Sequence, residues 1–326
     1  MKKTIGIIGG EPAGMSCALW LKTLGFQPII FEKNEQLGGL QTINSFSNIR
    51  YLGLHGQTGI NLAQQFRQHV ELASISSLLN SKLEAISKDL DGSFRLTTKM
   101  HNIRVHGIVI ATGQRFRAYE SIDSIAGSIS LETSSRVCFN PGTVPATYGK
   151  VVAVVGGGDN GLGMAALLAD TAEHIHLLVR STIRGFKYNQ QQVLEYVKTG
   201  RISLYTPSII QQFDVQNDHI NITISQGDES RTISAHHICF RLGYAPNVET
   251  ITQLLDHAQL SLEQTAKGHI DVDPFARTSI PGIYAIGDVA NPRDPCVATA
   301  VAHGAVAARS IDEDFQNSDE HGQTLK

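Results

Sequence analysis

Two short glycine-rich segments contain the residues whose types and spacing could do chemistry. In the first, Gly9 and Gly14 stand at the outer positions of a strand-to-helix turn, but Glu11 occupies the central place where a glycine is usual. The second, "GGGDNG" at 156–161, keeps all three glycines. Backbone N–H groups at such a turn can cradle a pyrophosphate when glycines let the backbone come close. One turn alone is a weak signal, because any tight turn can require glycine, and the carboxylate of Glu11 would repel a phosphate.

Charged residues follow the next expected strand after each turn. Glu32 and Lys33 come first, and a carboxylate there can accept hydrogen bonds from ribose hydroxyls, although a solvated charge is an equally simple interpretation. The corresponding stretch after the second turn carries Arg180, Arg184 and Lys187 and no acidic residue. These cations suit a 2′-phosphate, and the alternative is an ordinary solvated basic loop.

The elements that must position these residues occur twice in the chain. Runs of Ile and Val before each turn predict buried parallel strands, and "MSCALWLKTLG" and "LGMAALLAD" carry apolar residues at helical spacing. Two short strands follow each unit, around Asp91-Gly92 and around Asn217-Asp218, and then comes a strand that ends in glycine. The repeated order predicts an α/β protein with two Rossmann-like, three-layer ββα nucleotide-binding domains.

Composition narrows the class of protein. The 326 residues are 41% hydrophobic and 17% charged, which fits about two soluble domains, and the net charge of −3 gives no reason to expect a nucleic-acid partner. No run of 18 apolar residues occurs, so we expect no membrane span. The four cysteines have neither CxxC nor metal-ligand spacing, which predicts no metal and favours a reducing, cytoplasmic location.

The chain resembles the thioredoxin reductase-like flavoproteins, a group that includes ferredoxin/flavodoxin–NADP reductases of the same architecture. The resemblance rests on segments in family order along nearly the whole chain: "GGEPAG" (9–14), Glu32, "LGGLQT" (37–42), "VIATG" (109–113), "GGGDNG" (156–161), "LGYAPN" (242–247) and "IPGIYAIGDVA" (280–290).

This resemblance implies an FAD-binding domain, 1–117 and 242–326, into which an NAD(P)-binding domain, 118–241, is inserted. It places Asp288 near the flavin ribityl chain and 295–297 near the flavin pyrimidine. The cofactor-binding residues it implies are Gly9, Glu11, Pro12, Ala13, Gly14, Glu32, Lys33, Gly39, Leu40, Ala111, Thr112, Gly113, Gly287, Asp288, Cys296 and Val297 for FAD, and Gly156, Gly158, Asp159, Asn160, Gly161, Arg180 and Arg184 for the nicotinamide nucleotide.

The chain departs from the family pattern at several of these places. Besides Glu11, Leu40 stands where glutamine is more frequent, and Val179 and Ser181 replace a histidine and an arginine of members that use NADPH. Thioredoxin reductases carry CxxC just before the second turn, but here the stretch reads Cys138-Phe139-Asn140-Pro141. A disulfide relay needs two thiols, so ordinary thioredoxin reduction is not expected.

No catalytic side chain stands out in the sequence. Cys138 could be a lone reactive thiol, but a buried packing residue is the simpler interpretation. Cys296 replaces the glutamine of a family Arg-Gln pair, and its thiol need not act. His303 could donate a proton, although a structural role is the simpler interpretation.

The leading hypothesis is an FAD-dependent NAD(P)H oxidoreductase. It would pass hydride from NADPH, or from NADH, to the flavin and then electrons to a ferredoxin, a flavodoxin or a small molecule. The alternatives are a non-catalytic nucleotide-binding relic or sensor of the same fold, and a flavoprotein with another ligand, such as a second flavin, in the second domain. The resemblance also implies a homodimer.

Overall fold

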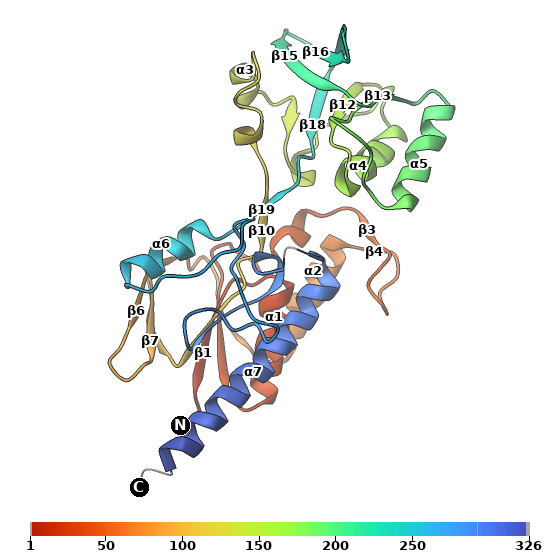
Figure 1. Cartoon of the computed structure of the whole chain (residues 1–326). Coiled ribbons are helices and arrows are strands. Elements are labelled where there is room, and N and C mark those ends of the chain that lie inside the picture. Colours follow the sequence, from red (N-terminus) through yellow and green to blue (C-terminus); the bar gives the residue numbers. More distant parts are fainter. Residues whose placement is uncertain (1, 292, 324–326) are drawn as a thin grey trace. The chain divides into compact units, whose positions relative to one another are not determined.

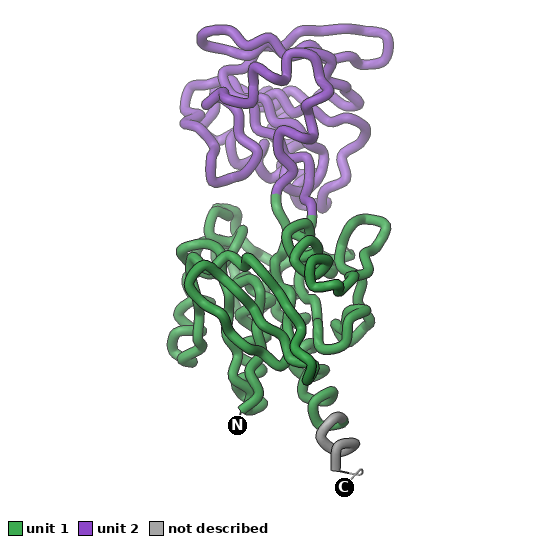
Figure 2. Tube along the Cα trace, turned by 90° about the vertical axis from the view of Figure 1, so that its left-hand side faces the viewer, with its two compact units in different colours: residues 1–115, 246–326 green, residues 116–245 purple. Residues whose placement is uncertain are grey.

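The computed structural model describes residues 2–291 and 293–323 and divides the chain into two compact units (Figures 1 and 2). Unit 1 comprises Met1–Arg115 and Pro246–Lys326, and unit 2 comprises Phe116–Ala245. Residues 1, 292 and 324–326 of the predicted FAD domain lie outside the described part. The chain passes between the units twice, through strands β10 (Gln114–Phe116) and β19 (Tyr244–Pro246), which pair with each other.

Unit 1 is built on a five-stranded parallel sheet with the order β20-β9-β1-β2-β5. The strands other than the edge strand β5 are largely apolar and buried, because both faces of the sheet are covered. Ile5 and Ile7 of β1 pack in the cluster that contains Met15 and Ala307, whereas Ile8 packs in the cluster that contains Phe94. The strands are β1 (Thr4–Ile8), β2 (Gln27–Phe31), β5 (Ser76–Leu78), β9 (Gly107–Ile110) and β20 (Ile283–Ala285).

Helices cover one face of this sheet, and a three-stranded antiparallel sheet with one helix covers the other. Gly6 of β1 faces the antiparallel sheet so closely that a Cβ there would lie 2.5 Å from Cδ1 of Leu96. On the helical face, α1 packs along the long α7, as Figure 1 shows. The covering elements are α1 (Pro12–Thr23), α2 (Gly59–Leu72) and α7 (Val297–Gln323) on one face, and β6 (Leu83–Lys88), β7 (Phe94–Thr98), β8 (Asn102–Val105) and α6 (Glu249–His257) on the other.

Unit 2 repeats this plan. Its parallel sheet has the order β11-β18-β12-β13-β14, and a second antiparallel sheet, β15-β16-β17, packs over one face through Phe213, Ile222 and Phe240. The strands are β11 (Val137–Cys138), β12 (Val151–Val155), β13 (His174–Leu178), β14 (Ile202–Tyr205), β15 (Ile209–Val215), β16 (Ile220–Gln226), β17 (Glu229–Ala235) and β18 (His237–Phe240), with helices α4 (Asp159–Ala169) and α5 (Lys187–Lys198).

The predicted fold class is therefore confirmed: two three-layer Rossmann-like units, with the second inserted into the first. Both predicted hairpins form, with Asp91-Gly92 between β6 and β7 and Asn217-Asp218 between β15 and β16. None of the helices in the described ranges is both long and apolar enough to cross a membrane. The remaining short elements are η1 (Gly39–Ile43), β3 (Ser47–Asn48), β4 (Gln57–Thr58), η2 (Tyr119–Ser121), α3 (Ile129–Glu132), η3 (Pro141–Thr143) and η4 (Gly287–Val289).

Candidate functional site

The first glycine turn joins β1 to α1, and packing within the protein accounts for both of its outer glycines. Gly9 has φ +108°, and a Cβ on it would lie 2.3 Å from the carbonyl oxygen of Ala111. A Cβ on Gly14 would lie 2.1 Å from the carbonyl oxygen of Gly9. Pro12 begins α1, and no side chain caps the helix N-terminus. The first-turn N–H groups of α1 are thus positioned to receive an anion.

Glu32 is buried at the end of β2, so it is not a solvated surface charge. Its Oε2 accepts a hydrogen bond from the backbone N–H of Gly10 at 2.8 Å. Its Oε1 accepts from the backbone N–H and the side-chain amide of Asn34, at 2.9 and 2.7 Å. The carboxylate therefore ties the glycine turn to the end of β2 and still has lone pairs for a ligand.

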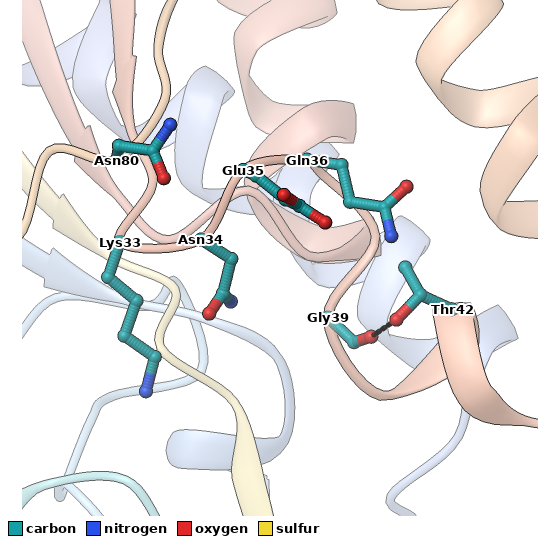
Figure 3. Close-up of a pocket in the computed structure, with 7 residues that line it drawn as sticks. All are labelled: Lys33, Asn34, Glu35, Gln36, Gly39, Thr42 and Asn80. Atoms are coloured by element: carbon teal, nitrogen blue, oxygen red, sulfur yellow. Dashed lines mark hydrogen bonds between the residues drawn. The ribbon is translucent and has the colours of Figure 1, made fainter. Parts of the chain in front are cut away.

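A cavity of about 520 Å³ lies past the carboxyl end of β2, where Lys33 and Asn34 belong to its lining (Figure 3). Its lining is almost entirely polar, which suits a ligand with many hydrogen-bonding groups. Within it, the hydroxyl of Thr42 donates to the carbonyl oxygen of Gly39 at 2.8 Å. The lining residues are Lys33, Asn34, Glu35, Gln36, Gly39, Thr42 and Asn80.

The side chain of Glu11 lies directly over two further glycines of the site. A Cβ on Gly39 would lie 2.4 Å from Cδ of Glu11, and one on Gly113 would lie 2.2 Å from its Oε2. Burial raises the pKa of Glu11 well above its usual range, and the carboxylates of Asp288 and Glu32 raise it further. The burial of Glu11 therefore favours the neutral form of its carboxyl group, which carries no charge to repel a phosphate.

Asp288 lies on η4 with one unsatisfied oxygen. Its Oδ2 accepts a hydrogen bond from the amide of Gln114 at 2.9 Å, while its buried Oδ1 has no partner. Burial raises the pKa of Asp288 to about 6. A buried acceptor without a partner is unfavourable, so this atom is positioned for a hydroxyl group of a bound ligand.

His303 and Cys296, the two weak catalytic candidates of unit 1, differ in burial. His303 accepts a hydrogen bond at Nδ1 from the backbone N–H of Gly287, at 3.1 Å, and burial lowers its pKa. The neutral imidazole thus holds the η4 turn and has no proton on Nδ1 to donate. Cys296 is exposed just before α7, with Sγ 3.4 Å from the hydroxyl of Thr299.

The second glycine turn joins β12 to α4. Gly156 has φ +145°, and a Cβ there would lie 2.4 Å from the carbonyl oxygen of Arg241. A Cβ on Gly161 would lie 2.1 Å from the carbonyl oxygen of Gly156, so packing explains both of these glycines. A Cβ on Gly158 would meet nothing within 4 Å. This central glycine therefore leaves open space in front of the uncapped start of α4, as a dinucleotide needs.

Of the polar residues around this turn, Asp159 is hydrogen-bonded within the protein, whereas two arginines make no ion pair with any residue that the structure describes. Oδ1 of Asp159 accepts from the backbone N–H of Phe186 at 2.6 Å and from the amide of Asn189 at 2.8 Å, so it holds the start of α5. Arg180 and Arg184 are exposed after β13 and make no ion pair within the described ranges. Their guanidinium groups are available to an anionic ligand.

The structure also brings together two thiols that the sequence separates by 101 residues. Cys138 of β11 and Cys239 of β18 are register partners on neighbouring strands, with their sulfur atoms 2.9 Å apart. Both are buried, as the packing interpretation of Cys138 expects. Sequence reasoning missed Cys239, Arg241 and Gln114, because nothing in their spacing indicates what they contact.

Comparison with known proteins places this geometry in a family. The chain matches the pyridine nucleotide-disulphide oxidoreductase family over residues 3–306. It is 29% identical to the ferredoxin–NADP reductase of Limosilactobacillus fermentum over 288 residues, 87% of this chain and 84% of the relative. It is 28% identical to the NADPH-dependent thioredoxin reductase 3 of Arabidopsis thaliana over 320 residues, 95% of this chain and 58% of that protein.

A solved structure shares the fold over nearly the whole chain. The thioredoxin reductase of Lactococcus lactis in its FR conformation superimposes with a TM-score of 0.82 at 22% identity, covering 97% of this chain and 98% of the other. The family resemblance expected from the sequence is confirmed. The two repeated nucleotide-type turns, the inserted second unit and the match over residues 3–306 together show that this chain belongs to the pyridine nucleotide-disulphide oxidoreductase family.

Proposed function

We propose that the chain is an FAD-dependent oxidoreductase that takes reducing equivalents from NADPH and passes electrons to a ferredoxin- or flavodoxin-like acceptor. The observation that carries this proposal is the pair of helix-start anion sites, one in each unit, in a chain of this oxidoreductase family. FAD would supply the hydride-accepting ring, and the protein would supply binding, orientation and electrostatics.

The residues of unit 1 fit FAD. The N-terminus of α1 suits its pyrophosphate, Glu32 and the polar cavity past the end of β2 suit the adenosine, and the orphaned Oδ1 of Asp288 suits a ribityl hydroxyl. The fit requires that Glu11 be neutral or turn aside, because its side chain covers Gly39 and Gly113. Its raised pKa favours the first condition, and a neutral carboxyl can donate a hydrogen bond to a phosphate oxygen.

Unit 2 would hold the nicotinamide nucleotide at the start of α4, with Gly158 facing its pyrophosphate. Arg180 and Arg184 would bind a 2′-phosphate, which favours NADPH over NADH. Asn160, in the first turn of α4, is the remaining residue that we propose to bind the nicotinamide nucleotide. We also propose that the protein acts in the cytoplasm, which its cysteine usage favours, and that it forms a homodimer, as the sequence resemblance implies.

The acceptor is proposed from both chemistry and similarity. Pro141 stands where a dithiol relay would need its second sulfur, so a thiol-independent acceptor fits the chain better than thioredoxin. The similarity to ferredoxin–NADP reductases supports an iron–sulfur or flavodoxin partner.

The test is an anaerobic acceptor assay with FAD-loaded protein and NADPH. We expect reduction of ferredoxin or flavodoxin, followed by their absorbance, and no reduction of thioredoxin disulfide. Thioredoxin reduction at a rate similar to that of ferredoxin would contradict the proposed acceptor class.

One observation favours a second candidate, a nucleotide-binding protein without catalysis. The side chain of Glu11 lies across Gly39 and Gly113, where the family places FAD. If the Glu11 carboxyl group stays charged and its side chain does not turn aside, the protein would bind no flavin. Flavin content after reconstitution separates the two candidates.

A further inference from the structure

The thiol pair in unit 2 lies next to a buried arginine. Arg241 follows β18, is 5% exposed, and forms no ion pair with any carboxylate of the described residues. Its Nη1 donates to the carbonyl oxygen of Phe240 at 2.7 Å, its Nη2 lies 3.7 Å from Sγ of Cys138, and its Nε has no hydrogen-bond partner. A buried guanidinium without a countercharge is costly, so the site favours an anion beside it.

Cys138 is the group that can supply this negative charge. The sulfur atoms of Cys138 and Cys239 lie within hydrogen-bond distance, and once Cys138 is ionised the S–H group of Cys239 can donate to it. This contact lowers the pKa of the Cys138 thiol, and the charge of Arg241 lowers it further, against the effect of burial, which raises it. The pKa of Cys239 is raised by the same contact and by burial. One sulfur is thus disposed to be a thiolate and the other a thiol, which is the division of roles in a reactive dithiol.

We propose that Cys138 and Cys239 form a redox-active dithiol, with Arg241 as the group that holds Cys138 as the nucleophile, and that its oxidant is a small hydroperoxide. The pair lies on adjacent parallel strands as direct register partners with their sulfur atoms 2.9 Å apart, so a disulfide requires the sulfurs to approach by only about 0.9 Å. This proposal goes beyond the proposed function and does not depend on it.

The chemistry balances with hydrogen peroxide. The thiolate of Cys138 attacks one peroxide oxygen, so an S–O bond forms, the O–O bond breaks and hydroxide leaves. Cys239 then attacks the sulfur of the resulting sulfenic acid, so an S–S bond forms and the S–O bond breaks, and the departing hydroxide takes the Cys239 proton as water. The hydroxide released in the first step takes a proton from the solvent, so the two sulfurs lose two electrons in total and one peroxide is reduced to two water molecules.

Only a small oxidant can reach the sulfur atoms of Cys138 and Cys239, which is why we propose a hydroperoxide. Both sulfurs are buried, so a protein disulfide cannot reach them in the folded chain. However, β11 is a two-residue strand at the edge of its sheet, and the segment after it, 139–146, is partly exposed. Short edge elements open locally at low cost, which admits a peroxide molecule.

The experiment uses the reduced full-length chain in a Cys296→Ser background, without added nucleotide. Cys296 is the exposed thiol, and burial raises the pKa of the remaining Cys17 thiol far above neutral, so Cys17 stays unreactive. After hydrogen peroxide, the protein is denatured, alkylated and mapped by mass spectrometry. We expect a mass lower by two hydrogen atoms and a peptide linked through Cys138 and Cys239.

Variants then separate the roles of the three residues. In Cys239→Ser, peroxide should leave a sulfenic acid on Cys138 that a dimedone probe labels, whereas Cys138→Ser should give neither product. Arg241→Met should slow oxidation about tenfold or more near neutral pH and shift its pH profile upward, and Arg241→Lys should restore part of the rate. A purely structural arginine would not move that profile.

Two results would overturn the proposal. One is that Cys138 and Cys239 are still free thiols after peroxide treatment, so that both become alkylated, under conditions that oxidise the exposed Cys296 of the unmodified chain. The other is equal peroxide reactivity of Cys138 with and without the charge at position 241. Because no flavin or nicotinamide enters this assay, its outcome is independent of the electron-transfer function.

Discussion

The carboxyl group of Glu11 is the residue that decides whether the first nucleotide site can be filled. It replaces a glycine that normally leaves room for a pyrophosphate, yet burial at this place raises its pKa, which favours the neutral form. Two unit charges ~4 Å apart at an effective dielectric near 20 repel by about 4 kcal/mol, so an ionised Glu11 would strongly oppose FAD binding.

Replacing Glu11 by glutamine should strengthen FAD binding at alkaline pH. We expect Glu11→Gln to bind FAD about tenfold to a hundredfold more tightly than the natural chain at about pH 8, because the amide cannot ionise. The advantage should shrink as the pH falls, since the natural carboxyl group is then neutral too. Quenching of flavin fluorescence measures the affinity.

The matched control is Glu35→Gln, which removes a different carboxylate, one that lines the polar cavity past the end of β2. It should change the affinity far less. An equal effect of the two substitutions would show that general charge, rather than the position of Glu11, controls binding.

The ionisation of Asp288 should make the free energy of unfolding of the FAD-free protein depend on pH. Burial raises its pKa from 3.8 to about 6, so the folded state binds the proton more strongly than the unfolded state does. Its contribution to the free energy of unfolding therefore falls as the pH rises from about 4 through 6, and the loss is complete above that range.

Asp288→Asn lacks this ionisation. We expect the variant to gain stability over the natural chain by about 1.4 kcal/mol on going from about pH 5 to about pH 8, measured by urea unfolding. A difference between the two proteins that does not change with pH would contradict the assigned cause.

At the scale of elements, the close approach of α1 and α7 holds the first site together. A Cβ on Gly304 would lie 2.5 Å from the carbonyl oxygen of Ala13 and 2.7 Å from the backbone nitrogen of Cys17. Nearby, the hydroxyl of Ser16 donates to the carbonyl oxygen of Val301 at 2.7 Å. The start of α1, where the phosphate would bind, is therefore fixed against α7.

Gly304→Val should force these two helices apart. The expected loss is about 1–3 kcal/mol in the free energy of unfolding, together with weaker FAD retention, because backbone atoms rather than flexible side chains must move. Ala302→Ser, at an exposed position of the same helix, should leave both quantities nearly unchanged. Thermal and urea unfolding provide the measurement.

The loop after β13 should set the choice of nicotinamide nucleotide. In Arg180→Ala combined with Arg184→Ala, we expect the KM for NADPH to rise about tenfold to a hundredfold, since charge-assisted hydrogen bonds to a 2′-phosphate would be lost. The KM for NADH should change little. Lys198→Ala, at the far end of α5, is the control, and a parallel rise for both nucleotides would argue against 2′-phosphate recognition.

The local patterns predicted the elements well. Alternating β-rich runs, helical spacing and turn residues such as Asp91-Gly92 gave strands, helices and hairpins near their observed places, because each signal lies within a few residues. The pairing of Cys138 with Cys239 could not be predicted in that way. It depends on which strands become neighbours in the sheet, and no local spacing encodes this.

Local sequence signals also could not show how the residues of the candidate site contact one another. The sequence placed Glu11 in the turn but could not show that its side chain extends over Gly39 and Gly113, which belong to other segments. It offered a solvated charge as an alternative for Glu32, whereas the structure buries this carboxylate. Burial and contacts between distant segments are properties of the folded chain.

For the whole molecule, two units of the same plan, one inserted in the other, provide two anion sites in one chain. Such a pair is suited to transfer between two nucleotides, whereas one site would suffice for binding alone. The central claim is therefore that FAD and NADPH both bind and that reducing equivalents pass between them.

The most direct measurement is an anaerobic titration of FAD-reconstituted protein with NADPH, followed by flavin absorbance. The account predicts that the protein retains FAD and that NADPH bleaches it, more readily than NADH does. A protein that takes up no FAD even when Glu11 is neutralised by low pH or by Glu11→Gln would contradict it. So would bound flavin that neither nicotinamide reduces.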